Sequence, residues 1–424
     1  MLPVAVRFLP APDGEMARAA AAPGLIRLEL SRGYEAAGGL AWAALPEGAA
    51  ALEIDARGMG AEAAVALASG AALRAWNFRA KPEGRLHVLT EAPEAAARLW
   101  AAAEPGIAGN LFARALVAEP ANVLTPKEFV RRLEALSEYG LEVQTRGPKW
   151  LERHGYGALS AVGRAAKTGP YLVTLRWAGE GRPVALVGKG LCFDTGGISI
   201  KPAGGMEAMR ADMAGAAACA GAMLALALGA ARQAAVAVLA IAENTTGADS
   251  YRPGDLLRTR AGRSVQVIDT DAEGRLALAD ALHHTVEVEK PVAVLDAATL
   301  TGSIVVALGH HLAGLFGNDD TLRDAAMAAG RAVGEPLWPM PIGARHREDL
   351  NSDIADLLQC AQGRGQPDAC HAAAFLREFV GDTPWAHLDI AGMDLAEDDH
   401  PLAAKGMPTG FGARLFAALI TARA

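Results

Sequence analysis

The chain has 424 residues, carries a net charge of −8, and is 51% hydrophobic and 21% charged. This length allows two or three domains with a large hydrophobic core. The acidic balance and the scattered basic residues argue against a nucleic-acid binder, whose affinity depends on a basic stripe. Four widely spaced cysteines without a CxxC pair predict neither a disulfide framework nor a thiolate zinc site, and are typical of a reducing compartment.

The first 105 residues predict a small α/β domain. Its expected strands are residues 25–30, 50–58, 71–78 and 84–90. A helix is expected over residues 61–68, and a second helix over 92–106 leads out of the domain. Pro105-Gly106 marks the expected boundary with a second domain, residues 106–424. The N-terminus has neither the basic start nor the long apolar run of a signal peptide, which favours a cytoplasmic location.

The second domain predicts a mostly parallel sheet covered by helices on both faces, so the fold class is α/β. Near-continuous apolar runs alternate with helical segments there, which is the pattern of buried parallel strands. The runs are residues 170–177, 183–190, 234–244, 264–270 and 291–300. Several of them end in charged or glycine-rich turns. Since ligands gather at the carboxyl ends of parallel strands, we expect the functional site at these turns.

One uncharged stretch, residues 213–231, is nearly long enough to span a bilayer. It consists mostly of alanine and glycine, which transfer poorly into lipid, and a strand-like run follows it. We therefore expect a buried core helix here and no membrane association.

Residues 269–282, DTDAEGRLALADAL, carry a dense group of charges where a strand is expected to pass into a helix. Asp269, Asp271, Glu273 and Arg275 occupy every second position. Residues two apart in a strand point the same way, so these side chains are expected on one face. Three clustered carboxylates repel one another, and one arginine is too little to neutralise them. One or two divalent cations would suffice; a solvated acidic turn with an arginine partner is the alternative.

A second group of charged residues lies upstream, in residues 184–217. Lys189, Asp194, Lys201 and Asp212 each have an ordinary interpretation alone: a surface lysine, a turn aspartate or a helix N-cap. Glycines 196 and 197 allow positive φ in the turn after Asp194. Together with the downstream carboxylates, these residues bring oxygen ligands and two lysines to strand ends of one sheet. That set fits zinc, manganese or magnesium chemistry.

The histidines form no recognisable metal motif. No HExxH sequence occurs, and the members of the adjacent pairs His283-His284 and His310-His311 diverge on a helix. His387 is expected to be a hydrogen-bonded core residue at the end of a buried strand. The GKG tripeptide lacks the spacing of a P-loop, and no G-x-S-x-G elbow indicates a serine hydrolase.

Eight motifs follow one another at fitting spacings: VGKGLCFDTGGISIKP, MRADMAGAA, ENTTG, PGD, DTDAEGRLALADAL, DAATLTG, WAHLDIAG and KGM. In this order they resemble the cytosol (leucyl) aminopeptidase family, whose signature NTDAEGRL differs here only at its first position. The resemblance covers about residues 110–424, and the shorter N-terminal segment is similar only in position and class. It implies a two-metal exopeptidase that acts on peptides with a free N-terminus and assembles as a homohexamer.

By motif, the resemblance implies two divalent ions per subunit (Zn²⁺, Mn²⁺ or Mg²⁺). Their ligands would be Lys189, Asp194, Asp212, Asp271 and Glu273. Asp194 and Glu273 would bridge the ions, and Lys189 would need a lowered pKa because only a neutral amine ligates a metal. Lys201 would polarise the scissile carbonyl, and Arg275 would hold a bicarbonate ion as general base.

The implied mechanism is attack of a metal-bridging hydroxide on the first peptide bond. One ion and Lys201 would take up the developing negative charge, while the neutral α-amine of the substrate binds the other ion. Bicarbonate would carry the proton to the leaving amine. Because the amine must be neutral, mildly alkaline pH is expected to favour activity.

The first side-chain pocket is less strongly specified. The resemblance places Met209, Thr299, Gly302 and Met407 around it, a lining that suits leucine or methionine, and the main chain of Leu300 beside substrate and bicarbonate. Core packing is the alternative for the two methionines. Two departures from the family leave the substrate preference open: Asp269 replaces the usual Asn, and PDACHAAAFL lacks the usual Gly/Ser pattern.

Two other functions are alternatives to the two-metal aminopeptidase. A non-catalytic oligomer of the same fold would bind a partner instead of cleaving peptides, and a two-metal phosphoesterase would require histidine ligands or additional arginines. The proposed metal and catalytic residues are all present and the chain is acidic, which favours the aminopeptidase.

Overall fold

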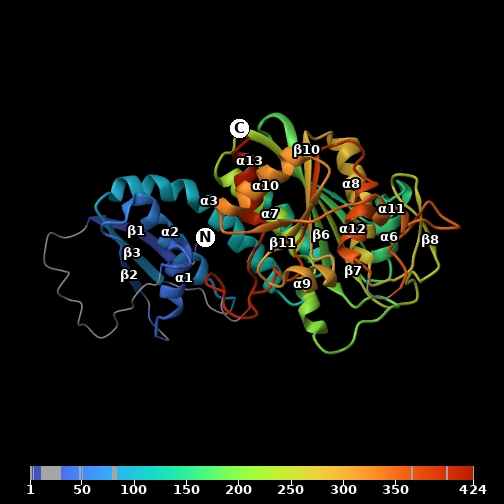
Figure 1. The fold of residues 1–424 in the computed structure, drawn as a ribbon, viewed down its shortest axis with the longest axis horizontal. Helices are drawn as coiled ribbons and strands as arrows, with labels where there is room; N and C mark the ends of the chain where they lie inside the picture. Colours follow the sequence, from blue (N-terminus) through green and yellow to red (C-terminus); the bar gives the residue numbers. More distant parts are fainter. Residues whose placement is uncertain are drawn as a thin grey trace. The chain divides into compact units, whose positions relative to one another are not determined.

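The computed structural model describes residues 2, 4–10, 30–46, 49, 51–78, 84–363, 366–397 and 400–423. The chain forms two compact units, each of which mixes helices and strands (Figure 1). The smaller unit comprises Met1–Leu111 and Leu395–Thr409, and the larger comprises Phe112–Asp394 and Gly410–Ala424. The α/β fold class is therefore confirmed, and one C-terminal segment returns to the smaller unit.

The smaller unit is built on a parallel three-stranded sheet of order β1-β3-β2. Its strands are β1 (Val4–Pro10), β2 (Ala51–Asp55) and β3 (Gly84–Thr90), and its helices are α1 (Tyr34–Ala43), α2 (Gly60–Arg74) and the first part of α3 (Pro93–Ala118). The strands expected over 50–58 and 84–90 are confirmed. Residues 25–29 of the candidate 25–30 lie outside the described residues, and β1 was not predicted.

Two expectations in this unit were wrong: the strand over residues 71–78, and the end of the outgoing helix at Pro105-Gly106. Residues 71–74 complete α2 instead of forming a strand, because Ala71, Ala72 and Leu73 are fully buried on the helix. Helix α3 also continues through Pro105 to Ala118. Ile107 is 1% exposed beyond the proline, so the burial of this part of the helix offsets the backbone hydrogen bond that proline removes.

The larger unit contains an eight-stranded sheet of order β12-β11-β14-β10-β6-β7-β5-β4. The central strands β14, β10, β6 and β7 are parallel, whereas β4, β5 and β11 pair antiparallel with their inner neighbours. The strands are β4 (Glu142–Arg146), β5 (Tyr171–Trp177), β6 (Glu180–Asp194), β7 (Gln233–Asn244), β10 (Ala293–Ala298), β11 (Ala313–Gly317), β12 (Leu337–Pro339) and β14 (Trp385–Asp389).

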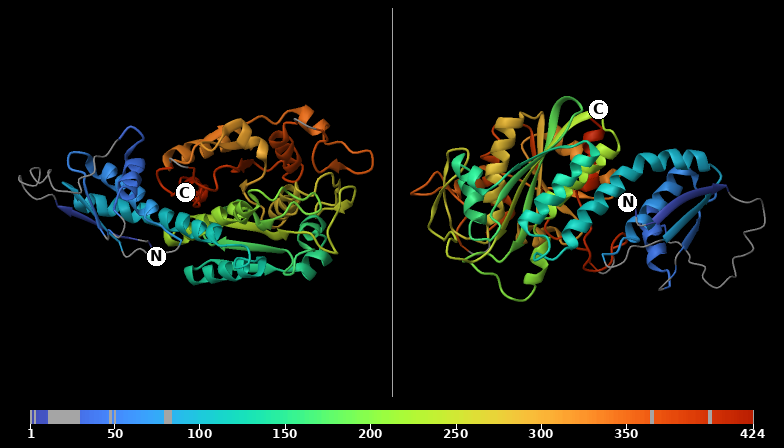
Figure 2. Two further views of the ribbon diagram at one scale, coloured as in Figure 1. Left: turned by 90° about the horizontal axis from the view of Figure 1, so that it is seen from below. Right: turned by 180° about the vertical axis from the view of Figure 1, so that it is seen from behind.

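Helices cover both faces of this sheet, as predicted (Figure 1), and Figure 2 shows the larger unit from two further sides. One face carries α7 (Ala214–Leu228), α10 (Asp320–Ala332) and α13 (Ala413–Thr421). The other carries α6 (Gly157–Gly163), α8 (Glu273–His284) and α12 (Asp368–Arg377). The remaining helices are α4 (Pro126–Glu134), α5 (Pro148–Arg153), α9 (Gly302–Leu308) and α11 (Ala344–Glu348).

Helix α7 is the buried core helix expected from the uncharged stretch. Met206–Leu228 has the length and apolar composition of a membrane span, but 89% of its most apolar window is buried inside the protein. The alanines and glycines of α7 allow the helix backbone to pack closely against the strands of the sheet. A Cβ on Gly215 would lie 2.0 Å from the carbonyl oxygen of Ala297, and one on Gly188 would lie 2.5 Å from Cα of Ala216.

A second, three-stranded sheet of order β13-β9-β8 lies outside the main sheet. Its strands are β8 (Leu256–Arg258), β9 (Ser264–Gln266) and β13 (Leu357–Leu358). The expected strand 264–270 is therefore wrong in length and in place. Only residues 264–266 are extended in this sheet, because the backbone from 268 to 272 bonds to side chains and loops instead of to a neighbouring strand.

Candidate metal centre

The candidate site is a cavity of about 650 Å³ in the larger unit. Its lining includes almost every residue that the sequence assigned to metal, catalysis or substrate: Lys189, Asp194, Lys201, Met209, Asp212, Asp269, Asp271, Glu273, Arg275, Thr299, Leu300 and Gly302. Met407 belongs to the smaller unit, so its place in the pocket stays a prediction. Within the described part of the chain, the lining contains Arg275 as its arginine and no histidine.

Three chain segments supply the residues of the cavity that the sequence assigned to metal binding. Lys189 and Asp194 lie in the second half of strand β6. Asp212 follows the short 3-10 helix η3 (Met206–Ala211), and its side chain accepts a hydrogen bond from Thr299 Oγ1 at 2.7 Å. The expected N-cap role of Asp212 is wrong, since the residue that caps α7 is Met213.

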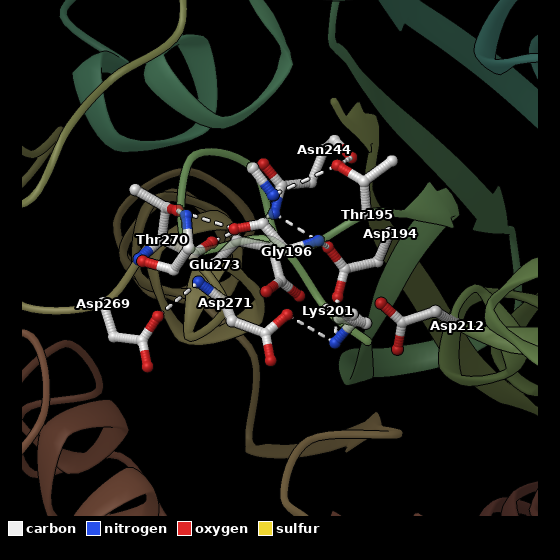
Figure 3. Close-up of polar contacts among 12 residues, drawn as sticks. Asp194, Thr195, Gly196, Lys201, Asp212, Asn244, Asp269, Thr270, Asp271 and Glu273 are labelled. Atoms are coloured by element: carbon white, nitrogen blue, oxygen red, sulfur yellow. Dashed lines mark hydrogen bonds and ion pairs between the residues drawn. The ribbon is translucent and has the colours of Figure 1, made fainter. Parts of the chain in front are cut away.

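The third segment is the acidic stretch, and its geometry differs from the expectation. Asp269 and Asp271 lie in a loop after β9, whereas Glu273 and Arg275 belong to the first turn of α8. The four side chains therefore do not share one face of a strand. Helix α8 begins at Glu273, and the loop before it turns Asp271 toward the end of β6 (Figure 3).

Two lysines neutralise the carboxylates of the cluster. Lys189 Nζ lies 2.8 Å from Asp212 Oδ1 and 2.9 Å from Glu273 Oε1, and it donates a hydrogen bond to the carbonyl oxygen of Thr299. Lys201 Nζ lies 2.8 Å from Asp194 Oδ2 and 2.5 Å from Asp271 Oδ1, between the two side chains (Figure 3).

Arg275 does not neutralise this cluster, contrary to the acidic-turn alternative. Its Nη2 instead lies 2.9 and 3.0 Å from the two carboxylate oxygens of Asp368.

Burial and mutual repulsion set the pKa values of these groups. Burial, with the neighbouring Asp194, raises the pKa of Glu273 to about 8, and burial likewise raises that of Asp212 to about 7. Burial by itself would lower the pKa of Lys189, but the carboxylates of Asp212 and Glu273 outweigh it and raise that pKa. Metal ligation requires the opposite direction, and a divalent cation beside the same carboxylates would reverse this balance.

The cluster fits a divalent metal. Asp194, Asp271 and Glu273 can each offer a carboxylate oxygen, and these oxygens lie within 4.8 Å of one another. The buried oxygens Asp212 Oδ2 and Glu273 Oε2 have no hydrogen-bond partner among the described residues. Leaving such atoms unsatisfied is costly, so they indicate a further ligand. Carboxylate oxygens are the donors that hard divalent cations prefer.

The loop that carries Asp269 and Asp271 is held by a residue that the sequence analysis missed. The side chain of Gln359 accepts hydrogen bonds from the backbone N–H of Ile268 (3.0 Å) and Asp269 (3.1 Å), and donates to the carbonyl of Ala272 (2.9 Å). Gln359 is fully buried. No motif surrounds it in the sequence, so no signal indicated this role.

Asn244 and Thr270 join this loop to the end of β6. Asn244 donates a hydrogen bond to Asp194 Oδ1 (2.7 Å) and to the carbonyl of Thr270 (3.0 Å). Thr270 Oγ1 donates to the carbonyl of Gly196, whose φ of +86° confirms the expected left-handed turn (Figure 3). The sequence did offer a signal for Asn244, since it ends an apolar run. Such runs are expected to be neighbouring parallel strands whose carboxyl ends meet at one site.

Asp389 at the end of strand β14 holds the turn formed by residues 299–302 through hydrogen bonds. Asp389 accepts hydrogen bonds from the backbone N–H of Leu300 (3.2 Å) and from Thr301 Oγ1 (2.6 Å). His387, as expected, is a buried core residue; its Nδ1 donates to Asp296 at 2.5 Å. These contacts hold the main chain of Leu300 at the wall of the cavity.

Comparisons with known proteins show which family the chain resembles. A sequence profile described as the catalytic domain of the cytosol aminopeptidase family matches residues 111–417. A probable cytosol aminopeptidase of Brucella melitensis is 43% identical over 347 residues, which is 81% of this chain and 71% of the relative. One from Gluconobacter oxydans is 44% identical over 367 residues, 84% of this chain and 74% of the relative. Among solved structures, the bottromycin maturation enzyme BotP in complex with Mn is similar, with a TM-score of 0.85 and 33% identity over the whole of both chains.

Proposed function

The chain belongs to the cytosol aminopeptidase family, and we propose that it releases N-terminal amino acids, leucine or methionine preferred, from peptides by two-metal catalysis. The family makes it a metal-dependent peptidase. The observation that carries the proposal is the convergence of one lysine and four carboxylates in one cavity: Lys189, Asp194, Asp212, Asp271 and Glu273. Two of their buried oxygens lack a partner among the described residues, and the set fits divalent ions.

When bound, two divalent ions would supply a water nucleophile of near-neutral pKa, a Lewis acid for the scissile carbonyl and a ligand site for the neutral α-amine. Lys201 stands at the cavity surface with 20% of its side chain exposed, and it would stabilise the negative charge that develops on the carbonyl oxygen. The backbone of Leu300 would hold the peptide. In the family that the chain resembles, a bicarbonate ion on the arginine at the position of Arg275 would carry the proton of the attacking water to the leaving amine, but in this chain Asp368 already contacts that arginine.

The pocket, metal and assembly are proposals of the same kind. Met209, Thr299 and Gly302 line the cavity, and the resemblance assigns the first side chain of the substrate to them. Mn²⁺ or Zn²⁺ are the ions that we propose; the solved structure of BotP in complex with Mn supports the first. A homohexamer in the cytoplasm is proposed from the resemblance to the family.

The test is hydrolysis of leucine p-nitroanilide by the full chain loaded with Mn²⁺ or Zn²⁺. Activity should disappear on chelation and return with metal. Glu273→Gln should remove both activity and bound metal, measured by elemental analysis, whereas Glu287→Gln, at a half-exposed glutamate paired with Arg260, should keep both. A metal-loaded protein that cleaves no peptide with a free N-terminus would instead indicate the non-catalytic oligomer.

A further inference from the structure

Arg275 and Asp368 form an ion pair at the wall of the cavity. The Arg275 side chain is 2% exposed, and its Nη2 lies 2.9 and 3.0 Å from the two carboxylate oxygens of Asp368. The Asp368 side chain is 39% exposed and lines the same cavity as Asp271 and Glu273. One side of this carboxylate therefore faces the guanidinium while the rest stays open to the cavity.

The direction of the Asp368 side chain is not explained by its own helix. Asp368 is the first residue of α12, where a carboxylate ordinarily interacts with the helix N-terminus. Asp320, by comparison, begins α10 and stays within its own helix, where it pairs with Arg323. The partner of Asp368 lies 93 residues away on α8, and the N–H of Ala369 bonds to Ser303 instead.

A buried guanidinium needs an anion, and here both carboxylate oxygens of Asp368 lie within hydrogen-bond distance of one guanidinium nitrogen, Nη2. A small carboxylate-like ion from solution would present the same planar pair of oxygens and the same charge. Asp368 thus already occupies Nη2, and Nη1 donates to the carbonyl oxygen of Gln359 at 3.3 Å. A planar external anion such as bicarbonate would find only Nε of Arg275 without a partner among the described residues.

We propose that Asp368 is the general base of the reaction and replaces an external anion on Arg275; the inference rests on the proposed aminopeptidase activity. An O–H bond of the attacking water breaks, its proton moves to an Asp368 oxygen, and the water oxygen bonds to the carbonyl carbon. The C–N bond then breaks, and the carboxylic acid of Asp368 returns the proton to the leaving amine. Arg275 orients the carboxylate in both steps.

The experiment compares wild type, Asp368→Ala, Asp368→Asn and the matched control Asp320→Ala as Zn²⁺-loaded full-length proteins in CO₂-free buffer. Wild type and the control should be fully active and insensitive to added bicarbonate or formate. Asp368→Ala should lose about 100-fold or more in kcat, the usual loss for a general base, and regain activity with either anion. Asp368→Asn keeps the side-chain volume, so its loss should not be rescued.

A second measurement does not depend on activity. Titration of ¹³C-bicarbonate followed by NMR should show binding to Asp368→Ala and none to wild type, and thermal unfolding confirms that the variants fold. The proposal is overturned if Asp368→Ala keeps wild-type kcat without added anion, or if wild type binds bicarbonate and is stimulated by it. If wild type cleaves no peptide, the base role of Asp368 is refuted together with the proposed function. If bicarbonate then binds to Asp368→Ala but not to wild type, the result still shows that Asp368 occupies the anion position on Arg275.

Discussion

Gly274 separates Glu273 from Arg275 in the first turn of α8, and a methyl group at this position is expected to disturb the metal centre. A Cβ there would lie 2.7 Å from Lys189 Cε, 2.8 Å from Lys189 Nζ and 2.9 Å from Leu300 Cδ1. Carbon atoms in contact are ordinarily about 3.5–4.0 Å apart. In Gly274→Ala, therefore, the lysine or the helix must move by about 1 Å.

The cost follows from what Lys189 would lose. Its ammonium group is held by Asp212, Glu273 and the carbonyl of Thr299 at 2.8–2.9 Å. Overpacking costs about 1–3 kcal/mol, and one lost hydrogen bond to a charged group adds about 1.5–3 kcal/mol. Alanine returns about 1 kcal/mol of helix propensity. We expect a net loss of about 1.5–5 kcal/mol in the free energy of unfolding.

The assay is urea unfolding of the metal-free protein together with calorimetric titration of Mn²⁺. Gly274→Ala should unfold at lower urea concentration than wild type and bind the metal more weakly. Gly204→Ala is the matched control, because nothing lies within 4 Å of its Cβ. Unchanged unfolding and unchanged Mn²⁺ affinity in Gly274→Ala would refute the close approach of this helix to Lys189.

Three further predictions concern residues around the site. Asp280→Ala should lower the unfolding free energy by about 2–4 kcal/mol in urea, because the buried carboxylate accepts N–H bonds from Leu159 and Arg260; an unchanged value would contradict this. Burial lowers the pKa of His284 to about 4, so its neutral form contributes stability above pH 6.5 that is lost as the pH falls toward 4. His284→Asn should therefore lose less stability than wild type over this range in parallel urea series. Asp269→Asn should reduce kcat/KM for lysyl relative to leucyl anilides by roughly tenfold, about 1.4 kcal/mol, and an unchanged ratio would exclude a charge preference.

The sequence predicted the composition of the cluster better than its geometry. Asp271 and Glu273 were expected to share a strand face, but they lie on a loop and a helix. Their grouping with Asp194 was still correct because several chain segments end at one edge of the main sheet. The strand expectation failed because the short apolar run around Val265 belongs to a small separate sheet, which periodicity alone does not distinguish from a central strand.

Contacts between distant residues were beyond the reach of sequence patterns. Asp368 is a polar residue at a helix start, and nothing in its neighbourhood indicates that its partner is Arg275, 93 residues earlier. The continuation of α3 past Pro105 depends likewise on the burial of Ile107 in the tertiary structure. In each case the local structure is determined by contacts between segments that are distant in the sequence, and local sequence preference does not reveal them.

The hydrogen bonds of Gln359 have a consequence for the order in which the protein folds. Gln359 lies 84–91 residues after the loop and helix positions that it holds. A nascent chain therefore exposes Lys189, Asp194 and Asp212 first, and Asp271 later, well before the residue that fixes the loop has been synthesised. Since closing a long loop costs entropy before its contacts form, we expect the metal centre to be among the last parts of the larger unit to reach its final form. A newly made chain thus has a period in which it already carries the acidic residues but cannot yet hold an ion in its native place.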